Sequence, residues 1–205
     1  MHKVMKLARV NPNPFAGIPP YRIGTHHTWT EQELTAYEAR WPLGTRERLA
    51  YAALLWTSQR AGDVVRMRRP VPTATAIDVV QQKTGAEVSI PIHSELWAAI
   101  KAGPSNGVFL IGDERGRPIS RHSLTRIVKA AAKAAGLPAK CLPHGLRKAA
   151  MRRLAEHGAT EKEIQGVSGH KTLKEIARYT AAASQKLLAE NAMGKLVSKK
   201  NGESV

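Results

Sequence analysis

Apolar residues recur along most of this chain at the three- and four-residue spacing of amphipathic helices. The first such stretch follows Thr30, which forms a capping-box pattern with Glu33, and it ends before Pro42. A second stretch, over residues 46–57, is apolar on nearly every face and is therefore expected to be buried. The same spacing predicts a short helix towards 67 and further helices over 96–102, 120–135, 145–157, 161–167 and from 172 past 179 to about 193.

One stretch, residues 75–92, shows the alternation of paired strands instead. Its apolar positions alternate with polar neighbours, at Ile77, Val79, Val88, Ile90 and Ile92. Lys83-Thr84-Gly85 lies between the two runs and is typical of a tight turn. The pattern predicts a β-hairpin. The expected fold class is therefore α+β, mainly α-helical, with one small antiparallel β-sheet near 75–92.

The two ends of the chain lack this periodicity. Residues 1–28 hold Asn11-Pro12-Asn13-Pro14 and Pro19-Pro20, which cannot continue a helix. The end of the chain is polar and basic. We therefore predict a folded domain over 29–193, an extended leader over 1–28 and a flexible basic tail over 194–205.

Several histidines and aromatic residues have ordinary structural explanations. His26 and His27, in the leader, are expected to be solvated, and Cys141 is expected to have a plain structural role. Tyrosines and tryptophans on the apolar stripes are expected in or near the core, namely Tyr37, Tyr51, Trp29, Trp41, Trp56 and Trp97.

The charge of the chain indicates a polyanionic partner. Lysine and arginine number 32 against 16 acidic residues, a formal net charge of +16. From charge alone, DNA, RNA and the absence of any specific partner all stay open. The single cysteine excludes an internal disulfide, which fits a reducing compartment. With no apolar run near the roughly 18 residues of a membrane span and no signal segment, we expect a cytoplasmic protein without membrane contact.

Polar residues occur at two helix ends where an amphipathic core would not need them. Arg60 follows the buried helix, with Asp63 placed to orient it, although alone this pair could be a surface ion pair. His144 precedes the next predicted helix and Arg147 lies in its first turn, where a cation opposes the helix dipole. A bound phosphate would remove that conflict, so we expect exposed arginine side chains facing a basic groove.

A third segment adds a nucleophile. Gly169-His170 is followed nine residues later by Tyr179 on the last predicted helix. Two arginines can clamp the oxygens of a phosphodiester, histidines can move protons, and a tyrosine can attack phosphorus. Lys83 at the hairpin tip could protonate a leaving oxygen. None of this chemistry needs a metal or cofactor, and no His, Cys, Asp or Glu group shows the sequence spacing of metal ligands.

The order of Arg60, Lys83, His144-x-x-Arg147, Gly-His170 and Tyr179 resembles the active-site signature of the tyrosine recombinase family, which includes the phage integrases. The resemblance spans residues 29–182. Ser168 stands where the family usually has leucine, a departure that is expected to matter little. Ser58 stands where glycine is common, which puts nothing catalytic in doubt. The resemblance implies that Arg60, Lys83, His144, Arg147, His170 and Tyr179 are catalytic, supported by Asp63.

The resemblance also implies a reaction and partners. Tyr179 would attack the scissile phosphate of double-stranded DNA and form a 3′-phosphotyrosyl link, without ATP, metal or cofactor. Residues 1–28 would be a linker from an N-terminal core-binding domain. Other protomers of the same protein would join on DNA in a tetrameric synapse, with residues 180–193 docking either on their own domain or on a neighbour.

Two alternative functions share parts of this pattern. A type IB topoisomerase uses similar chemistry but rejoins the same strand, and the Gly169-His170 motif favours a recombinase. A DNA-binding protein that has lost catalysis would show damage at a catalytic position, and none is seen. Among the tyrosines, only Tyr179 follows the Gly-His pair, and nearby arginines and histidines are expected to favour its phenolate.

Overall fold

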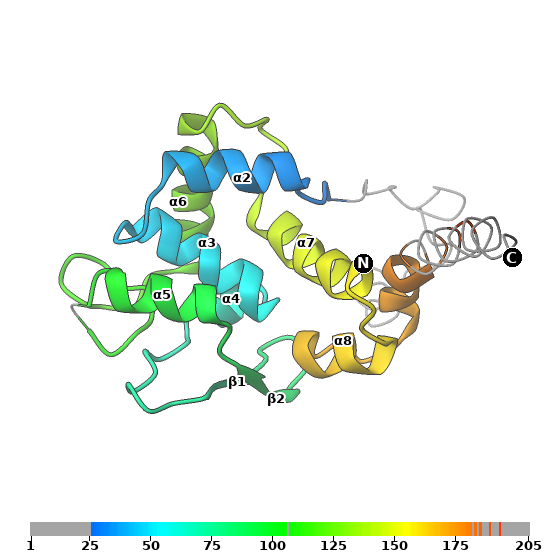
Figure 1. The fold of residues 1–205 in the computed structure, drawn as a ribbon. Helices are drawn as coiled ribbons and strands as arrows, with labels where there is room; N and C mark the ends of the chain where they lie inside the picture. The colour runs from blue at the N-terminus through cyan, green and yellow to red at the C-terminus, as the bar shows by residue number, and fades with distance from the viewer. Residues whose placement is uncertain are drawn as a thin grey trace, which may run out of the picture.

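The computed structural model describes residues 26–105, 107–181, 183, 185, 189 and 193, and these form a mainly helical fold with one small sheet (Figure 1). Residues 174–181 are helical as well. The named elements are α2 (Glu31–Arg40), α3 (Arg46–Thr57), α4 (Ala61–Val64), β1 (Ala76–Val80), β2 (Glu87–Pro91), α5 (Ser94–Ala102), α6 (Arg121–Ala134), α7 (Pro143–Glu156) and α8 (Glu161–Ser168). The predicted fold class is confirmed. The leader before residue 26 and the tail after 193 lie outside the described residues.

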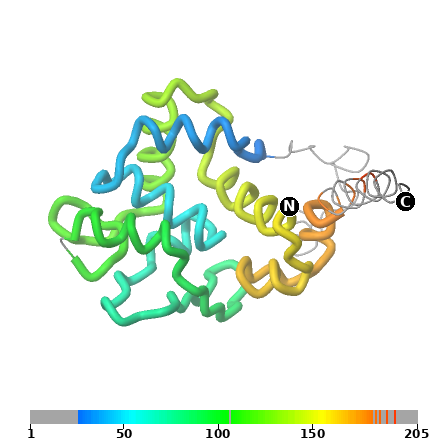
Figure 2. The backbone as a smooth tube through the Cα atoms, in the orientation of Figure 1, coloured from blue at the N-terminus to red at the C-terminus, as the bar shows by residue number. Residues whose placement is uncertain are grey.

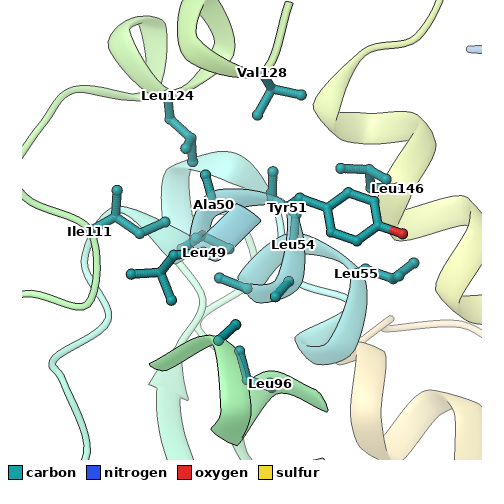
Figure 3. Close-up of a cluster of buried hydrophobic side chains, with 14 of the residues drawn as sticks. Leu49, Ala50, Tyr51, Leu54, Leu55, Leu96, Ile111, Leu124, Val128 and Leu146 are labelled. Carbon is teal, nitrogen blue, oxygen red and sulfur yellow. The ribbon is translucent and has the colours of Figure 1, made fainter. Parts of the chain in front are cut away.

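Helix α3 is the central element of the hydrophobic core. Its side chains are buried on nearly every side, as the apolar composition predicts. Figure 3 shows α3 residues surrounded by Leu96 of α5, Leu124 of α6 and Leu146 of α7. The predicted core aromatics are confirmed: Tyr37 stacks on Tyr51 at 4.8 Å between ring centroids, and Trp29 is fully buried.

The predicted hairpin is confirmed, and its two strands pair antiparallel. Ile77 lies opposite Ile90 and Val79 opposite Val88, so the apolar side chains share one face. Strand β2 contacts α8, and the two lie beside each other in both backbone views (Figures 1 and 2). The turn is held by Gly85 N donating to Gln81 O at 2.8 Å, which leaves Lys83 exposed.

Helix α7 begins two residues before the predicted start. Pro143 is its first residue, where a fixed φ is favourable and the missing N–H is not needed. His144 is therefore inside the first turn, and Arg147 lies beyond that turn, on a face that is buried. No helix in the described part of the chain is both long and apolar enough to cross a membrane.

Ser58, between α3 and α4, is a source of strain. It has φ 53° and ψ 27°, the left-handed region, and among described residues it is the only non-glycine with positive φ. Its buried hydroxyl has no hydrogen-bond partner within the described structure. The family's glycine would adopt this conformation without steric cost. Ser58 therefore bears on stability, whereas the expectation for this position concerned catalysis alone.

We expect Ser58→Gly to stabilise the protein by about 1 kcal/mol, because the relief of left-handed strain exceeds the added entropy of the unfolded chain. The midpoint of urea unfolding measures the change. Ser89→Gly, the same exchange in extended backbone on β2, is expected to lower the midpoint. Equal effects of the two exchanges would contradict the explanation.

Candidate active site

Predicted site residues from three segments line one open cleft of about 690 Å³. Arg60 and Asp63 come from α4 and its N-cap, Lys83 from the hairpin turn and His144 from the start of α7. His26, Arg121 and His122 also line this cleft and add to its basic character. The fold thus brings together positions that are far apart in sequence: Arg60 and His144 are separated by 84 residues.

Arg147 lies buried behind this cleft, not exposed within it. Its side chain is 1% exposed, which contradicts the expectation of an exposed arginine. Nη1 donates to Ser58 O at 2.6 Å and Nη2 donates to Ser168 O at 2.9 Å. Nη2 also lies 3.1 Å from His170 Nε2. Burial and then the charge of Arg60 lower the pKa of Arg147 to about 10, so it remains charged at neutral pH.

Arg60 is held by an amide and not by the expected carboxylate. Its Nη1 donates to Gln81 Oε1 at 2.9 Å. Asp63 instead accepts the backbone N–H of Gln82 at 2.9 Å through Oδ1, and no hydrogen bond or ion pair joins it to Arg60 among the described residues. Asp63 therefore fixes the hairpin turn to α4. The structure therefore gives no direct bond by which Asp63 would orient Arg60: Oδ1 is bound to the turn, and Oδ2 has no hydrogen-bond partner among the described residues.

His144 lies at the surface of the cleft beside a second histidine. The ring of His26 is 4.7 Å from the His144 ring, between centroids, and His26 is exposed, as expected. Partial desolvation, followed by His26 and Arg147, lowers the pKa of His144 to about 4. The side chain is exposed, so we attribute the direction more to its cationic neighbours than to burial.

His170 is fixed by three neighbours. Its Nδ1 lies 2.7 Å from Ser168 Oγ, and its backbone oxygen accepts a hydrogen bond from Gln165 Nε2 at 2.8 Å. Arg147 Nη2 can only donate, so it requires a lone pair on the ring. Desolvation and the charge of Arg147 lower the pKa of His170 to about 4. The expectation that Ser168 matters little is therefore incomplete, because its hydroxyl helps to fix the His170 ring.

The lowered pKa of His170 predicts acid sensitivity. Because the folded state favours the neutral ring, its contribution to stability is full above the unfolded pKa near 6.5 and is lost as pH falls towards 4. Melting temperatures measured at pH 7.5 and pH 5 should show this loss. In His170→Gln the loss should be smaller. An unchanged loss in that variant would show that another group is responsible.

Tyr179 is placed on the helical segment that follows His170. Its side chain is half-buried and packs against the small cluster of Met151, Ala155, Ile164 and Ile176. Burial raises its pKa, and the charges of Arg178 and Arg147 offset this only in part. The expectation that neighbouring cations make the phenolate favourable is therefore wrong for the protein without DNA. In the described structure no hydrogen bond joins Tyr179 to the arginines or histidines.

Among the described residues, three side chains with metal-ligand chemistry lie close together outside the cleft. Ligand atoms of His27, Glu33 and Cys141 lie within 4.8 Å of one another, although sequence spacing gave no sign of it. Glu33 Oε2 already accepts from Thr30 N at 2.8 Å in the capping box and lies 2.7 Å from His27 Nε2. These bonds give His27 and Glu33 a structural explanation, and Cys141 lies beside them as a buried free thiol.

Two buried polar residues of the site are absent from the sequence prediction. Gln59 and Gln81 are both fully buried and hydrogen-bonded to each other, with Gln81 Nε2 donating to Gln59 Oε1 at 2.6 Å. Gln81 stands at the end of the alternating strand pattern. A glutamine there reads as a turn residue at the surface, and only long-range packing reveals its burial.

Comparison with known proteins gives a consistent family assignment. The family model described as the phage integrase family matches residues 30–186. Tyrosine recombinase XerD of Xanthomonas campestris pv. campestris is 30% identical over 177 residues, covering 75% of this chain and 53% of that relative. The type 1 fimbriae regulatory protein FimE of Escherichia coli K12 is 36% identical over 81 residues, covering 40% of each chain.

Solved structures agree on the fold. A lambda integrase (75–356) dimer bound to a COC′ core site aligns with TM-score 0.68 and 23% identity, over 87% of this chain and 68% of that one. XerA recombinase aligns with TM-score 0.67 and 17% identity, over 91% of this chain and 71% of that one. Lambda integrase has also been solved as a tetramer bound to a Holliday junction. The chain spans about half or less of the length of the curated relatives it matches.

Proposed function

The chain belongs to the phage integrase family, and on that premise we propose that it catalyses site-specific recombination of double-stranded DNA through a 3′-phosphotyrosyl intermediate. The observation that carries this proposal is the clustering of Arg60, Lys83 and His144 on one cleft with Arg147 and His170 hydrogen-bonded to each other behind it. Such a cluster of fixed cations and proton carriers suits the negative charge that develops on a phosphodiester under attack.

The steps balance without a cofactor. The Tyr179 oxygen attacks phosphorus and the bond from phosphorus to the 5′ oxygen breaks, which leaves a phosphotyrosine and a 5′-hydroxyl. The phenol proton passes to His144 or His170, whose rings are neutral at pH 7. At His170 the proton displaces the hydrogen bond from Arg147 Nη2, which uses the lone pair of the neutral ring. Lys83 supplies a proton to the leaving oxygen. Attack by a 5′-hydroxyl of a partner strand reverses the step, so the bond energy is conserved.

The raised pKa of Tyr179 determines when the phenol proton must leave in this mechanism. A buried phenol is protonated at pH 7, so proton removal must accompany attack. Arg60 and Arg147 then serve chiefly to stabilise the phosphate charge. Asp63 has a different supporting role, because it fixes the turn that carries Lys83.

Trapping of a covalent adduct tests the proposed function. The chain is incubated with a pool of nicked duplexes whose sequence is randomised around the nick. Because of the nick, the short fragment released by cleavage diffuses away, and rejoining is blocked. Denaturing electrophoresis should then show a protein–DNA adduct, and sequencing of the trapped DNA would identify the target site. The absence of any adduct, with duplex binding intact, would count against a recombinase.

We propose further that the chain acts in the cytoplasm as one catalytic domain over 29–193, with 1–28 as a linker and 194–205 as a basic tail. Its only cysteine is a buried free thiol, which fits a reducing compartment. Lambda integrase is seen as a dimer on a core site and as a tetramer on a Holliday junction. By analogy, several copies of this chain would assemble on DNA, with residues 180–193 as a candidate contact.

Binding to random duplex should depend strongly on salt. The formal net charge is +16, and the cleft contributes Arg60, Lys83 and Arg121. If several phosphates are neutralised, affinity should fall roughly a hundredfold or more between 50 and 200 mM salt. Fluorescence anisotropy across this range measures the slope, and Arg121→Gln should reduce the slope by about one. A flat response would contradict phosphate binding.

A further inference from the structure

Gln81, at the end of β1, joins the segments that carry the predicted site residues. It is fully buried. Its amide nitrogen donates to Gln59 Oε1 at 2.6 Å and to Ser168 O at 2.8 Å. Its amide oxygen accepts from Arg60 Nη1 at 2.9 Å and from Thr84 Oγ1 at 2.7 Å. Both donors and both acceptor positions of the amide are therefore used.

The amide has only one satisfactory orientation. Rotation by half a turn would face its N–H groups to Arg60 and its oxygen to two other oxygens. Gln59 cannot adapt, because its own Nε2 donates to Thr57 O at 3.0 Å and Val167 O at 2.8 Å. A buried network with every member satisfied is rigid, since any displacement leaves polar groups unpaired.

Packing around Gln81 preserves this arrangement. Gly169 has φ +64°, and a Cβ atom there would collide with the Gln81 amide. Ser168 O accepts from both Gln81 Nε2 and Arg147 Nη2, at 2.8 and 2.9 Å. The amide is thus tied to the loop of His170 as firmly as to its own hairpin.

Arg60 depends on this amide. Within the described residues, Gln81 Oε1 is the only hydrogen-bond partner of its guanidinium, and no carboxylate pairs with it. A neutral amide fixes the direction of the guanidinium but leaves its positive charge uncompensated. An acidic partner would compete with a phosphate for the same charge.

We propose that Gln81 is a positioning residue for Arg60, which holds the guanidinium at the cleft through its amide oxygen and leaves its charge for the scissile phosphate. The inference rests on the proposed function of Arg60 in phosphate binding. Gln81 lies outside the predicted signature, and the inference gives it a role in the rate of cleavage.

A double-mutant cycle on single-turnover cleavage of a nicked duplex tests the proposal. Arg60→Ala should slow cleavage roughly a hundredfold to a thousandfold, as for other charge-stabilising donors. Gln81→Met, which keeps length and volume, should slow it roughly tenfold to a hundredfold by misplacing Arg60. In the double variant, loss of Gln81 should add less than about threefold to Arg60→Ala. Multiplication of the two losses would overturn the proposal.

Two comparison variants separate positioning from loosening of the fold. Gln59→Met removes a buried glutamine of the same network but leaves the bond from Arg60 to Gln81, so it should lower the melting temperature with a smaller loss of cleavage than Gln81→Met. Gln32→Leu, an exposed exchange on α2, should leave both unchanged. If Gln81→Met does not melt cooperatively, Gln81→Asn, which withdraws the amide by one methylene, replaces it in the cycle.

A measurement without DNA distinguishes this proposal from the proposed function. In ¹⁵N NMR, hindered rotation should give Arg60 separate Nη signals in the wild type and merged signals in the Gln81 variant. If the signals are separate in the wild type and merge in the Gln81 variant, but the wild type forms no covalent adduct, the recombinase function is rejected and the positioning role of Gln81 is retained. If the wild type forms an adduct but the Arg60 Nη signals do not change in the Gln81 variant, only the positioning role of Gln81 is rejected.

Discussion

Replacing Tyr179 with phenylalanine is expected to abolish covalent capture of DNA while folding and duplex binding stay close to wild type. The exchange removes one oxygen and almost no volume. In the described structure that oxygen makes no hydrogen bond, and the ring packs against Met151 and Ile164, contacts that phenylalanine retains. The only function lost is therefore the nucleophile itself.

The experiment has a matched control in the same chain. Tyr37→Phe removes a core hydroxyl, which donates to Glu47 O at 3.2 Å, and should lower stability slightly while the adduct still forms. Trapping on nicked duplex and peptide mapping of the adduct measure the outcome. An adduct that persists in Tyr179→Phe, or one mapped to another tyrosine, would overturn the mechanism.

The elements of the fold were readable from the sequence because each has a local cause. The Thr30 capping box, the apolar α3 and the alternation in the hairpin all act over a few residues, and all three were confirmed. Where the prediction of α7 was wrong, the signal was also local, since Pro143 at a helix start is favourable and was available in the sequence.

The environments of the site residues were not readable in this way. The burial of Arg147, the partner of Arg60 and the raised pKa of Tyr179 each depend on segments that meet only in the folded chain. Asp63 lies three residues after Arg60, and sequence proximity suggested a pair that the geometry does not form. Sequence order therefore identified candidate residues but not which of them touch.

Substitution of Arg147 should damage cleavage and stability together, because its side chain is buried and not exposed as the sequence led us to expect. Alanine leaves the buried carbonyl of Ser58 without its charged donor, at about 1–3 kcal/mol for an unsatisfied group, whereas Ser168 O keeps its hydrogen bond from Gln81 Nε2. Removal of a desolvated cation offsets part of this, since burial already lowers the pKa of Arg147 to about 10. We expect a net loss of about 2 kcal/mol of stability.

A second substitution separates the two roles. Arg147→Met fills much of the space of the side chain and also removes the buried charge, so it should unfold at a higher urea concentration than Arg147→Ala. Both variants lack the guanidinium and should cleave a nicked duplex at least about a hundredfold more slowly than wild type. Arg147→Lys replaces the planar fork, whose two Nη atoms reach the two carbonyls, with a single ammonium, and it should resemble them in cleavage.

The count of donors explains why a buried arginine can still serve the phosphate. Of five N–H groups, one donates to Ser58 O and two of Nη2 face Ser168 O and His170, which leaves two for a ligand. Single-turnover cleavage and urea unfolding of the three variants measure both roles. Near-normal cleavage by Arg147→Met would remove Arg147 from the phosphate clamp. Unchanged stability of Arg147→Ala would show that the carbonyl of Ser58 does not depend on it.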